Sequence, residues 1–159
     1  MINPKHIVCA IALSVAGPMS AQSVPDRDGW TVHNTAHAFG DLVKRVQGAV
    51  KAAPINIISQ ASASNGAKQQ GYTIPGNRVI GIYRNDYARR MLDASIAAGI
   101  EAPLRLYITE NDDGTASLSY RGPSVVFSPY MDEGGDGLRE LAEELDGIFA
   151  DIAKEAVGS

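Results

Sequence analysis

Hydrophobic residues recur along this chain at spacings of three and four, and this spacing predicts two long helices. From Phe39 to Val50, the apolar positions fall on one face of a helix. The same spacing returns from Leu138 to Ile152, where acidic residues fill the positions between. The sequence therefore predicts two amphipathic helices, each with one apolar stripe that packs against another layer.

Alternation of apolar and polar residues predicts strands elsewhere in the chain. Between Leu104 and Thr109, apolar residues alternate with polar ones, as in a strand with one buried face. A strong hairpin turn at residues 111–114 leads into a second alternating run that ends at Tyr120. Three further runs predict strands because they are rich in β-branched or aromatic residues; they cover residues 30–33, 55–58 and 78–83.

Capping signals set the expected limits of the helices. Asn34 or Thr35 is suited to cap the first long helix, which therefore follows the first strand directly. A second signal at Asn85 predicts a short helix that we expect to end at Gly99.

Two polar, glycine-containing stretches predict irregular structure. Residues 59–76 are expected to form a loop or a frayed strand, and residues 128–137 a loop; Asp136 is placed to cap the last helix. The expected order is then strand, helix, strand, strand, short helix, strand, strand, helix. Two helices with single apolar stripes over a mostly antiparallel sheet predict an α+β two-layer sandwich, with both helices on one face. The other face of the sheet is free to be concave.

The first residues have the pattern of a signal peptide. A positively charged start precedes an apolar run over residues 7–17, and small residues follow it. The run is shorter than the roughly 20 residues that span a bilayer, so we expect cleavage after Ala21 or Ser23 rather than a membrane anchor. The sequence therefore predicts a signal peptide over residues 1–23 and a single periplasmic or secreted domain over residues 24–159.

Composition narrows the classes of partner and chemistry. The only cysteine, Cys9, lies in the expected leader, so the mature chain has no disulfide and no thiol nucleophile. The full chain has 14 basic and 18 acidic residues, and removal of the leader takes Lys5 with it, which changes the net charge from −4 to −5. A mildly acidic protein without a cluster of basic residues is a poor candidate for binding nucleic acid or an anionic membrane surface. We expect no membrane insertion once the leader is removed.

A series of short motifs carries a resemblance to a known family. They are an apolar strand that ends in Asn, a Met-Leu pair, Ala-Pro-Leu before the next strand, a charged hairpin, Leu-Ser-Tyr and a proline; these cover residues 79–85, 91–92, 102–104, 110–114, 118–120 and 123. In this order and spacing they resemble the bacterial family catalogued as domain of unknown function 302.

The resemblance covers most of the mature chain and implies the same order of elements, but it implies no chemistry. This chain departs from the family's usual pattern at two points. Members often have Asn-Pro where this chain has Asn85-Asp86, and they often carry a His or an acidic residue in the loop after the second strand. An activity that depends on an ionisable group in that loop is therefore not expected here.

The polar face of the sheet is the first candidate ligand site. Arg105 and Tyr107 point away from the apolar face, and Tyr83 and Arg121 lie near the ends of neighbouring strands. Such a cluster could hold a carboxylate or stack on a flat ligand. Gly81 within its strand could permit a close approach by backbone or ligand. The alternative is the ordinary polar face of an antiparallel sheet.

A second candidate lies where a strand meets a helix. Arg84 and Asn85 stand at the expected start of the short helix, where free N–H groups favour an anion. Asp86 would oppose that charge. The alternative is that Asn85 only caps the helix and Arg84 is solvated.

Three other patterns fall short of a site. His33 and His37 have a metal-ligand spacing if both lie on one helix face, but no third ligand is near, so we expect solvated histidines and no metal. Residues 62–68 lack the spacing of a phosphate loop and are expected at most to form the rim of a pocket. Residues 132–136 do not fit a calcium loop.

The sequence contains no recognised catalytic motif and implies no cofactor. We therefore expect a domain that binds a small molecule or a partner protein on the open face of its sheet. One alternative is an enzyme of unknown reaction in which Tyr83, Arg105 or Arg121 takes part. Another is an assembly module that forms a homodimer through its sheet.

Overall fold

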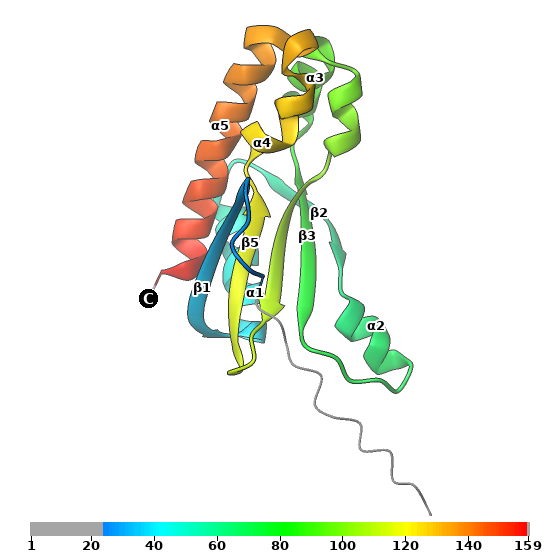
Figure 1. Ribbon diagram of the computed structural model, residues 1–159, viewed down its shortest axis with the longest axis vertical. Coiled ribbons are helices and arrows are strands. Elements are labelled where there is room, and N and C mark those ends of the chain that lie inside the picture. The colour runs from blue at the N-terminus through cyan, green and yellow to red at the C-terminus, as the bar shows by residue number, and fades with distance from the viewer. Residues whose placement is uncertain (1–23, 159) are drawn as a thin grey trace, which may run out of the picture.

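The computed structural model describes residues 24–158, and these form one open five-stranded sheet with helices on one face (Figure 1). The strand order is β1–β5–β4–β3–β2, and all four neighbouring pairs are antiparallel. In chain order the strands are β1 (Trp30–Ala38), β2 (Asn56–Ala61), β3 (Asn77–Tyr83), β4 (Leu104–Glu110) and β5 (Thr115–Arg121). The expected leader, residues 1–23, lies outside the described residues.

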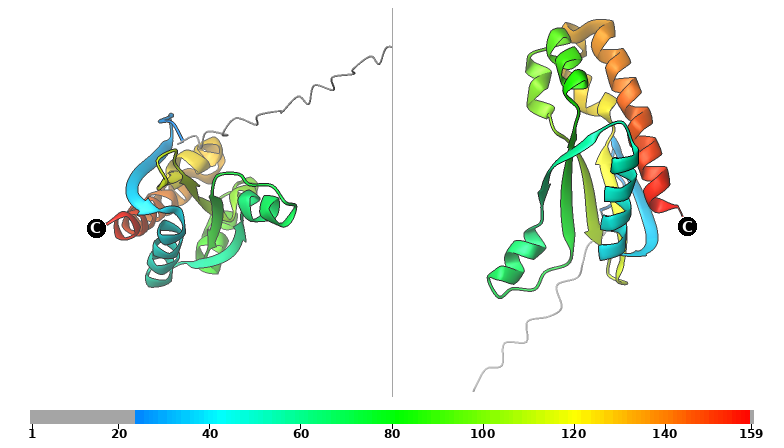
Figure 2. Two further views of the ribbon diagram at one scale, coloured as in Figure 1. Left: turned by 90° about the horizontal axis from the view of Figure 1, so that it is seen from below. Right: turned by 180° about the vertical axis from the view of Figure 1, so that it is seen from behind.

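The two long helices, α1 (Phe39–Ala52) and α5 (Met131–Val157), pack side by side against the same face of the sheet (Figures 1 and 2). The shorter elements are α2 (Ala63–Gln69), α3 (Asn85–Ala94), α4 (Pro123–Phe127) and the 3₁₀ turns η1 (Ala97–Glu101) and η2 (Ser128–Tyr130). This arrangement confirms the α+β two-layer sandwich. Between residues 24 and 158, no helix combines the length and the apolar character that a membrane span needs.

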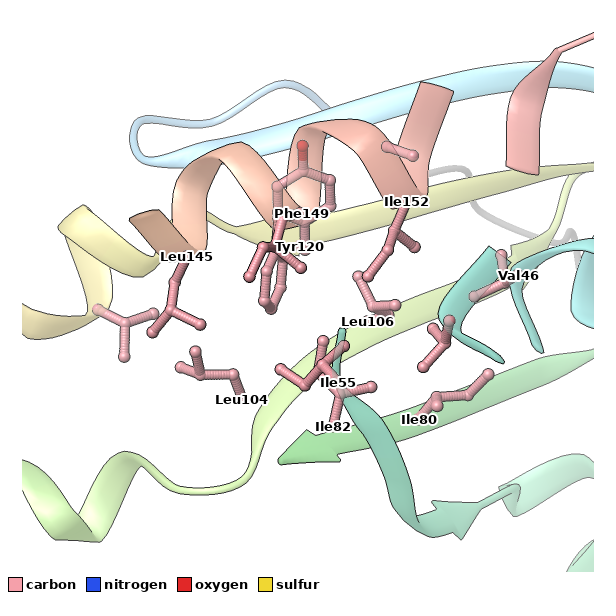
Figure 3. Packing of buried hydrophobic residues seen from close by; sticks show 14 of the residues in the cluster. Val46, Ile55, Ile80, Ile82, Leu104, Leu106, Tyr120, Leu145, Phe149 and Ile152 are labelled. Carbon is pink, nitrogen blue, oxygen red and sulfur yellow. The ribbon is translucent and has the colours of Figure 1, made fainter. Parts of the chain in front are cut away.

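The core lies between the sheet and the two long helices (Figure 3). Alternate strand residues and the helix stripes supply it, as the sequence pattern predicts; fully buried members include Leu42, Val46, Ile80, Ile82, Leu106, Ile108, Leu118, Leu138, Leu141 and Ile152. Tyr120 of β5 meets Phe149 of α5 edge-on, with ring centroids 5.2 Å apart. Burial of these side chains is the main force that holds the helix layer on the sheet.

Polar contacts fasten α5 near its C-terminal end and midway along its length. Nε of Arg45 in α1 donates to the carbonyl oxygen of Ala156 over 2.7 Å, and a second guanidinium nitrogen reaches Gly158. A cation there complements the partial negative charge of the helix C-terminus. Along α5, the Asp146 carboxylate accepts the Ser124 backbone N–H over 3.1 Å and so caps the start of α4.

β1 is longer than predicted, and neither Asn34 nor Thr35 caps a helix. The strand stays paired with β5 as far as Ala38, through a shift in register after Asn34. The Thr35 hydroxyl donates to the carbonyl oxygen of Ala116 over 2.7 Å. Because this pairing occupies the backbone, α1 begins only at Phe39.

Residues 59–76 begin as a strand, which was one of the two predicted alternatives, and continue as a helix that was not predicted. β2 runs on to Ala61, and Ser62 then caps α2 by accepting the Asn65 N–H over 3.1 Å. None of the side chains of α2 is buried. A helix without an apolar stripe gives no periodic signal in the sequence.

The predicted end of the short helix and the predicted loop before the last helix also need correction. The short helix ends at Ala94 rather than Gly99, and η1 follows it. Residues 128–137 are helical rather than a loop, because η2 leads directly into α5. Gly135, with a φ of 55°, interrupts α5 just before Asp136. Among the hydrogen bonds of the described residues, none has the Asp136 side chain capping the helix that follows.

Candidate functional site

The sheet face opposite α1 and α5 carries a hollow of about 620 Å³. A volume of this size is in the range of small-molecule sites. The hollow is lined by residues of all five strands and of α2, η1 and α4.

Strand pairing sets one row of residues across the hollow. Trp30 of β1 lies opposite Arg121 of β5, and Arg105 of β4 lies opposite Gly81 of β3. The pairing of β4 with β5 ends at Leu106 and Tyr120, and Arg105 and Arg121 are the next residues of the two strands toward the same end of the sheet. Both arginines and Trp30 line the hollow.

The next row along the strands consists of small side chains and one tyrosine. It reads Ala61, Val79, Tyr107 and Ser119 across β2, β3, β4 and β5. Ser119 is fully buried and Tyr107 is half-buried, while Ala61 stands at the exposed edge strand. This row forms the floor of the hollow, with Tyr107 as its one aromatic side chain.

Asn77 and the start of α2 close the far end. The Asn77 side chain accepts the Ala63 N–H over 2.8 Å and donates to the carbonyl oxygen of Pro75 over 3.2 Å. Ala61 and Ala63 both line the hollow, so residues 62–68 begin at its rim as the sequence suggested. They do so as a helix and not as a phosphate loop.

Gly81 permits a close approach by protein side chains rather than by a ligand. A Cβ atom at this position would collide with Oγ of Ser59 and would lie 3.0 Å from Cγ of Pro103. The glycine therefore lets β2 and the residues before β4 pack tightly over β3.

The lining of the hollow contains more positively than negatively charged side chains. Arg105 and Arg121 are exposed, and within residues 24–158 neither guanidinium takes part in a hydrogen bond or an ion pair. Glu101 is the acidic residue in the lining. Its carboxylate accepts the Tyr130 hydroxyl over 2.9 Å, and this bond raises the pKa of Tyr130.

Arg27 contacts Trp30 but is not part of the lining of the hollow. The guanidinium of Arg27 lies over the indole ring of Trp30, 5.3 Å from the ring centroid. Cation–π contacts of this kind favour a fixed orientation of the ring.

The remaining candidates, Tyr83, Arg84 and Asn85, lie at the end of β3 and outside the hollow. Asp86 holds the Arg84 guanidinium through two hydrogen bonds of 2.5 and 2.7 Å, which raise the pKa of Arg84 and lower that of Asp86. Arg84 also donates to the carbonyl oxygen of Pro54 over 2.6 Å. Its donors are therefore directed at protein groups.

The space beside Arg84 is small. Tyr83 and Arg84 line a cavity of about 30 Å³ between β3, α3 and α5, which has room for about one water molecule. Asn85 is the first residue of α3 and is exposed, and none of the hydrogen bonds among the described residues involves its side chain. Asn85 thus does not cap α3 in the way the sequence suggested.

The structure therefore brings together Arg105, Tyr107 and Arg121, and separates them from the group at Arg84. Sequence reasoning missed Trp30 and Glu101 as members of the hollow. Trp30 had a weak signal, because a strand was predicted there but its partner strand was not.

The two histidines both lie in β1 and not on a helix, so the helical spacing that metal ligands use does not apply to them. The His33 ring lies 6.2 Å from that of Tyr120, and its buried Nε2 has no hydrogen-bond partner among the described residues. His33 is therefore not the solvated histidine that the sequence suggested. Nε2 of His37 lies 3.3 Å from the carbonyl oxygen of Gly158. Across residues 24–158, three or more His, Cys, Asp or Glu side chains nowhere gather as metal ligands would.

Comparison with known proteins identifies the family to which this chain belongs. No curated protein matches the chain. The crystal structure of an uncharacterized conserved protein DUF302 from Bacillus stearothermophilus superimposes with a TM-score of 0.69 and 14% sequence identity, over 81% of this chain and 99% of that one. At this identity the likeness shows a shared fold. The model of the family described as "Domain of unknown function DUF302" matches residues 30–155, from the first residue of β1 to within the last turn of α5. The chain therefore belongs to the DUF302 family.

Proposed function

We propose that this protein binds a small molecule in the hollow on the uncovered face of its sheet. The observation that carries the proposal is the pair Arg105 and Arg121, whose guanidinium groups flank the hollow without a partner among residues 24–158. Two cations in one hollow repel each other, and an anion bound there would offset that repulsion.

The residues around the hollow support binding more than catalysis. Its ionisable lining consists of Glu101, two arginines and two tyrosines. Glu101 accepts a hydrogen bond from Tyr130, and the lining includes no histidine, lysine or cysteine to serve as base or nucleophile. This set can orient a charged ligand but offers no paired nucleophile and base.

We also propose that the protein works outside the cytoplasm. The support is the charged start, the apolar run over residues 7–17 and the small residues that follow, which together have the form of a signal peptide. N-terminal sequencing of the protein from its own host should find a start near Gln22 or Val24 in the periplasmic or secreted fraction. A cytoplasmic protein that still begins with Met1 would contradict export.

Native mass spectrometry of the protein purified from its own host tests the binding function. We expect a mass in excess of the polypeptide, and we expect the variant Arg105→Gln/Arg121→Gln to lose it. Arg89→Gln is the matched control, because Arg89 is an exposed arginine on α3, outside the hollow. An excess mass that persists in the double variant would place the ligand elsewhere. A dimer that dissociates in the double variant would show that a second copy, rather than a small molecule, covers the face.

A further inference from the structure

Building on the proposed function, we infer that the ligand is an amphipathic monocarboxylate. Its carboxylate would lie between Arg105 and Arg121, and its apolar body would lie along Tyr107 and Val79 toward the level of Asn77. This inference names the class of ligand for the same hollow.

The anionic end follows from the row of residues that includes the two arginines. A guanidinium can hold a carboxylate through two parallel, charge-assisted hydrogen bonds. Arg105 and Arg121 stand on adjacent strands, so one carboxylate can lie between both. Trp30, opposite Arg121, supplies an apolar wall beside the charge.

The apolar body follows from the next two rows. Residues two apart on one strand face are separated by about 7 Å, so Tyr107 lies about 7 Å beyond Arg105. The row of Tyr107 and Val79 presents one aromatic ring and small side chains. Farther on, the Asn77 amide bonds to Ala63 and Pro75, and Oγ1 of Thr109, its cross-strand partner, is buried without a hydrogen-bond partner among the described residues. The apolar body therefore ends before this polar level.

These spacings set the length of the ligand. The apolar body can extend from about 7 Å to about 14 Å beyond the arginines before it reaches the level of Asn77. A straight acyl chain of about eight carbons or a short arylalkyl group fills that distance. A single acetate would leave the floor of the hollow uncovered.

The preference for a ligand with a single negative charge follows from Glu101. The lining contains two guanidinium groups and one carboxylate, which leaves a formal charge of +1 for the ligand to match. A second negative charge on the ligand would face the Glu101 carboxylate, and like charges brought together across an interface are costly. The hollow should therefore prefer a monoanion to a dianion of the same length.

Calorimetric titration of the purified protein tests the inference, with Trp30 emission as a reporter of the site, since Trp30 is the only tryptophan of the chain and lines the hollow. The probes are octanoate, 4-phenylbutyrate, octanamide and octyl phosphate at pH 8, where octyl phosphate is a dianion. We expect octanoate or 4-phenylbutyrate to bind saturably, and the stronger of the two identifies an alkyl or an aryl body. Octanamide and octyl phosphate should each bind at least about tenfold more weakly than octanoate, which corresponds to about 1.4 kcal/mol.

The variant Arg105→Gln should lose about tenfold in affinity for the acids and little for octanamide, a difference that corresponds to about 1.4 kcal/mol. If that variant fails to fold, the comparison of the four probes on the wild-type protein still decides. Octanamide that binds as tightly as octanoate, or octyl phosphate that binds more tightly, would overturn the monocarboxylate while leaving the hollow a binding site. If neither acid binds but native mass spectrometry finds a ligand that the double variant loses, the inference fails and the proposed function stands. If that experiment also finds no ligand, both fail.

Discussion

The hydroxyl of Tyr87 donates a hydrogen bond to Oε1 of Glu144 over 2.7 Å and thereby joins α3 to α5. Arg90 donates to the other carboxylate oxygen over 2.6 Å. The bonds from Tyr87 and Arg90 lower the pKa of Glu144, whereas burial and the bond to Glu144 raise the pKa of Tyr87. One carboxylate therefore connects a buried aromatic ring and an exposed cation at the end of the molecule opposite α2 (Figure 1).

This bridge predicts a pH dependence of stability. The folded-state pKa of Glu144 lies below its unfolded value of about 4.3, so its contribution is present above that pH and is lost as the pH falls through the folded value. We expect Glu144→Gln to flatten the fall in stability between about pH 5 and pH 3. Urea unfolding at a series of pH values measures this. Glu143→Gln, a change at the exposed neighbouring position, should leave the wild-type profile unchanged.

Leu145 tests how α5 packs on the sheet. Its side chain is 3% exposed and lies with Leu104 in the core (Figure 3). Leu145→Ala should therefore cost about 2 to 5 kcal/mol in the free energy of unfolding, as buried leucine truncations do. Glu143→Ala, at an exposed position of the same helix, should stay within about 0.5 kcal/mol of wild type. A denaturation midpoint unchanged by Leu145→Ala would show that α5 does not pack as described.

Gly81 tests the close packing beside the hollow. Gly81→Ala should destabilise the protein by about 1 to 3 kcal/mol, because the new methyl group would meet Ser59 and Pro103. Adding Ser59→Gly should recover part of the loss, since it removes the colliding hydroxyl. Gly48→Ala is the control: Gly48 lies within α1 with nothing within 4 Å of the new methyl group, so we expect a gain of up to about 1 kcal/mol. Equal effects at the two glycines would argue against the contact.

Arg105 and Tyr107 should affect binding far more than folding. Arg105 is exposed, and the hydroxyl that Tyr107→Phe removes has no hydrogen-bond partner among the described residues. We expect Arg105→Ala and Tyr107→Phe to change the unfolding free energy by less than about 0.5 kcal/mol. Arg105→Ala should weaken the binding of an anionic ligand more than Tyr107→Phe does, because only Arg105→Ala removes a charge. If both variants unfold the protein, these side chains belong to its core and the site is elsewhere.

Local patterns predicted the part of the site that lies on neighbouring strands. The alternation from Leu104 onward placed Arg105 and Tyr107 on one face, and the turn at residues 111–114 predicted that β5 returns beside β4. Arg121 joins them because the alternation continues along β5. These inferences needed only periodicity and a turn signal, which short-range sequence contains.

Long-range pairing and tertiary contacts were beyond prediction. Trp30 enters the hollow only because β1 pairs with β5, its distant partner along the chain. α2 is stabilised by its Ser62 cap and by the bond from Ala63 to Asn77, although its residues give no apolar stripe. Arg84 donates to the carbonyl oxygen of Pro54, a contact between distant parts of the chain that no local pattern indicates.

The binding surface itself can be located in solution without knowledge of the ligand. The measurement is a ¹⁵N–¹H correlation spectrum of the assigned protein, recorded with and without mixtures of small organic acids, amides and amines. We predict that the amide shifts concentrate at Trp30, Arg105, Tyr107, Ser119 and Arg121, which surround the hollow. Shifts that concentrate instead at the end of β3 and on α3, while these five amides stay in place, would contradict a ligand site on the uncovered face of the sheet.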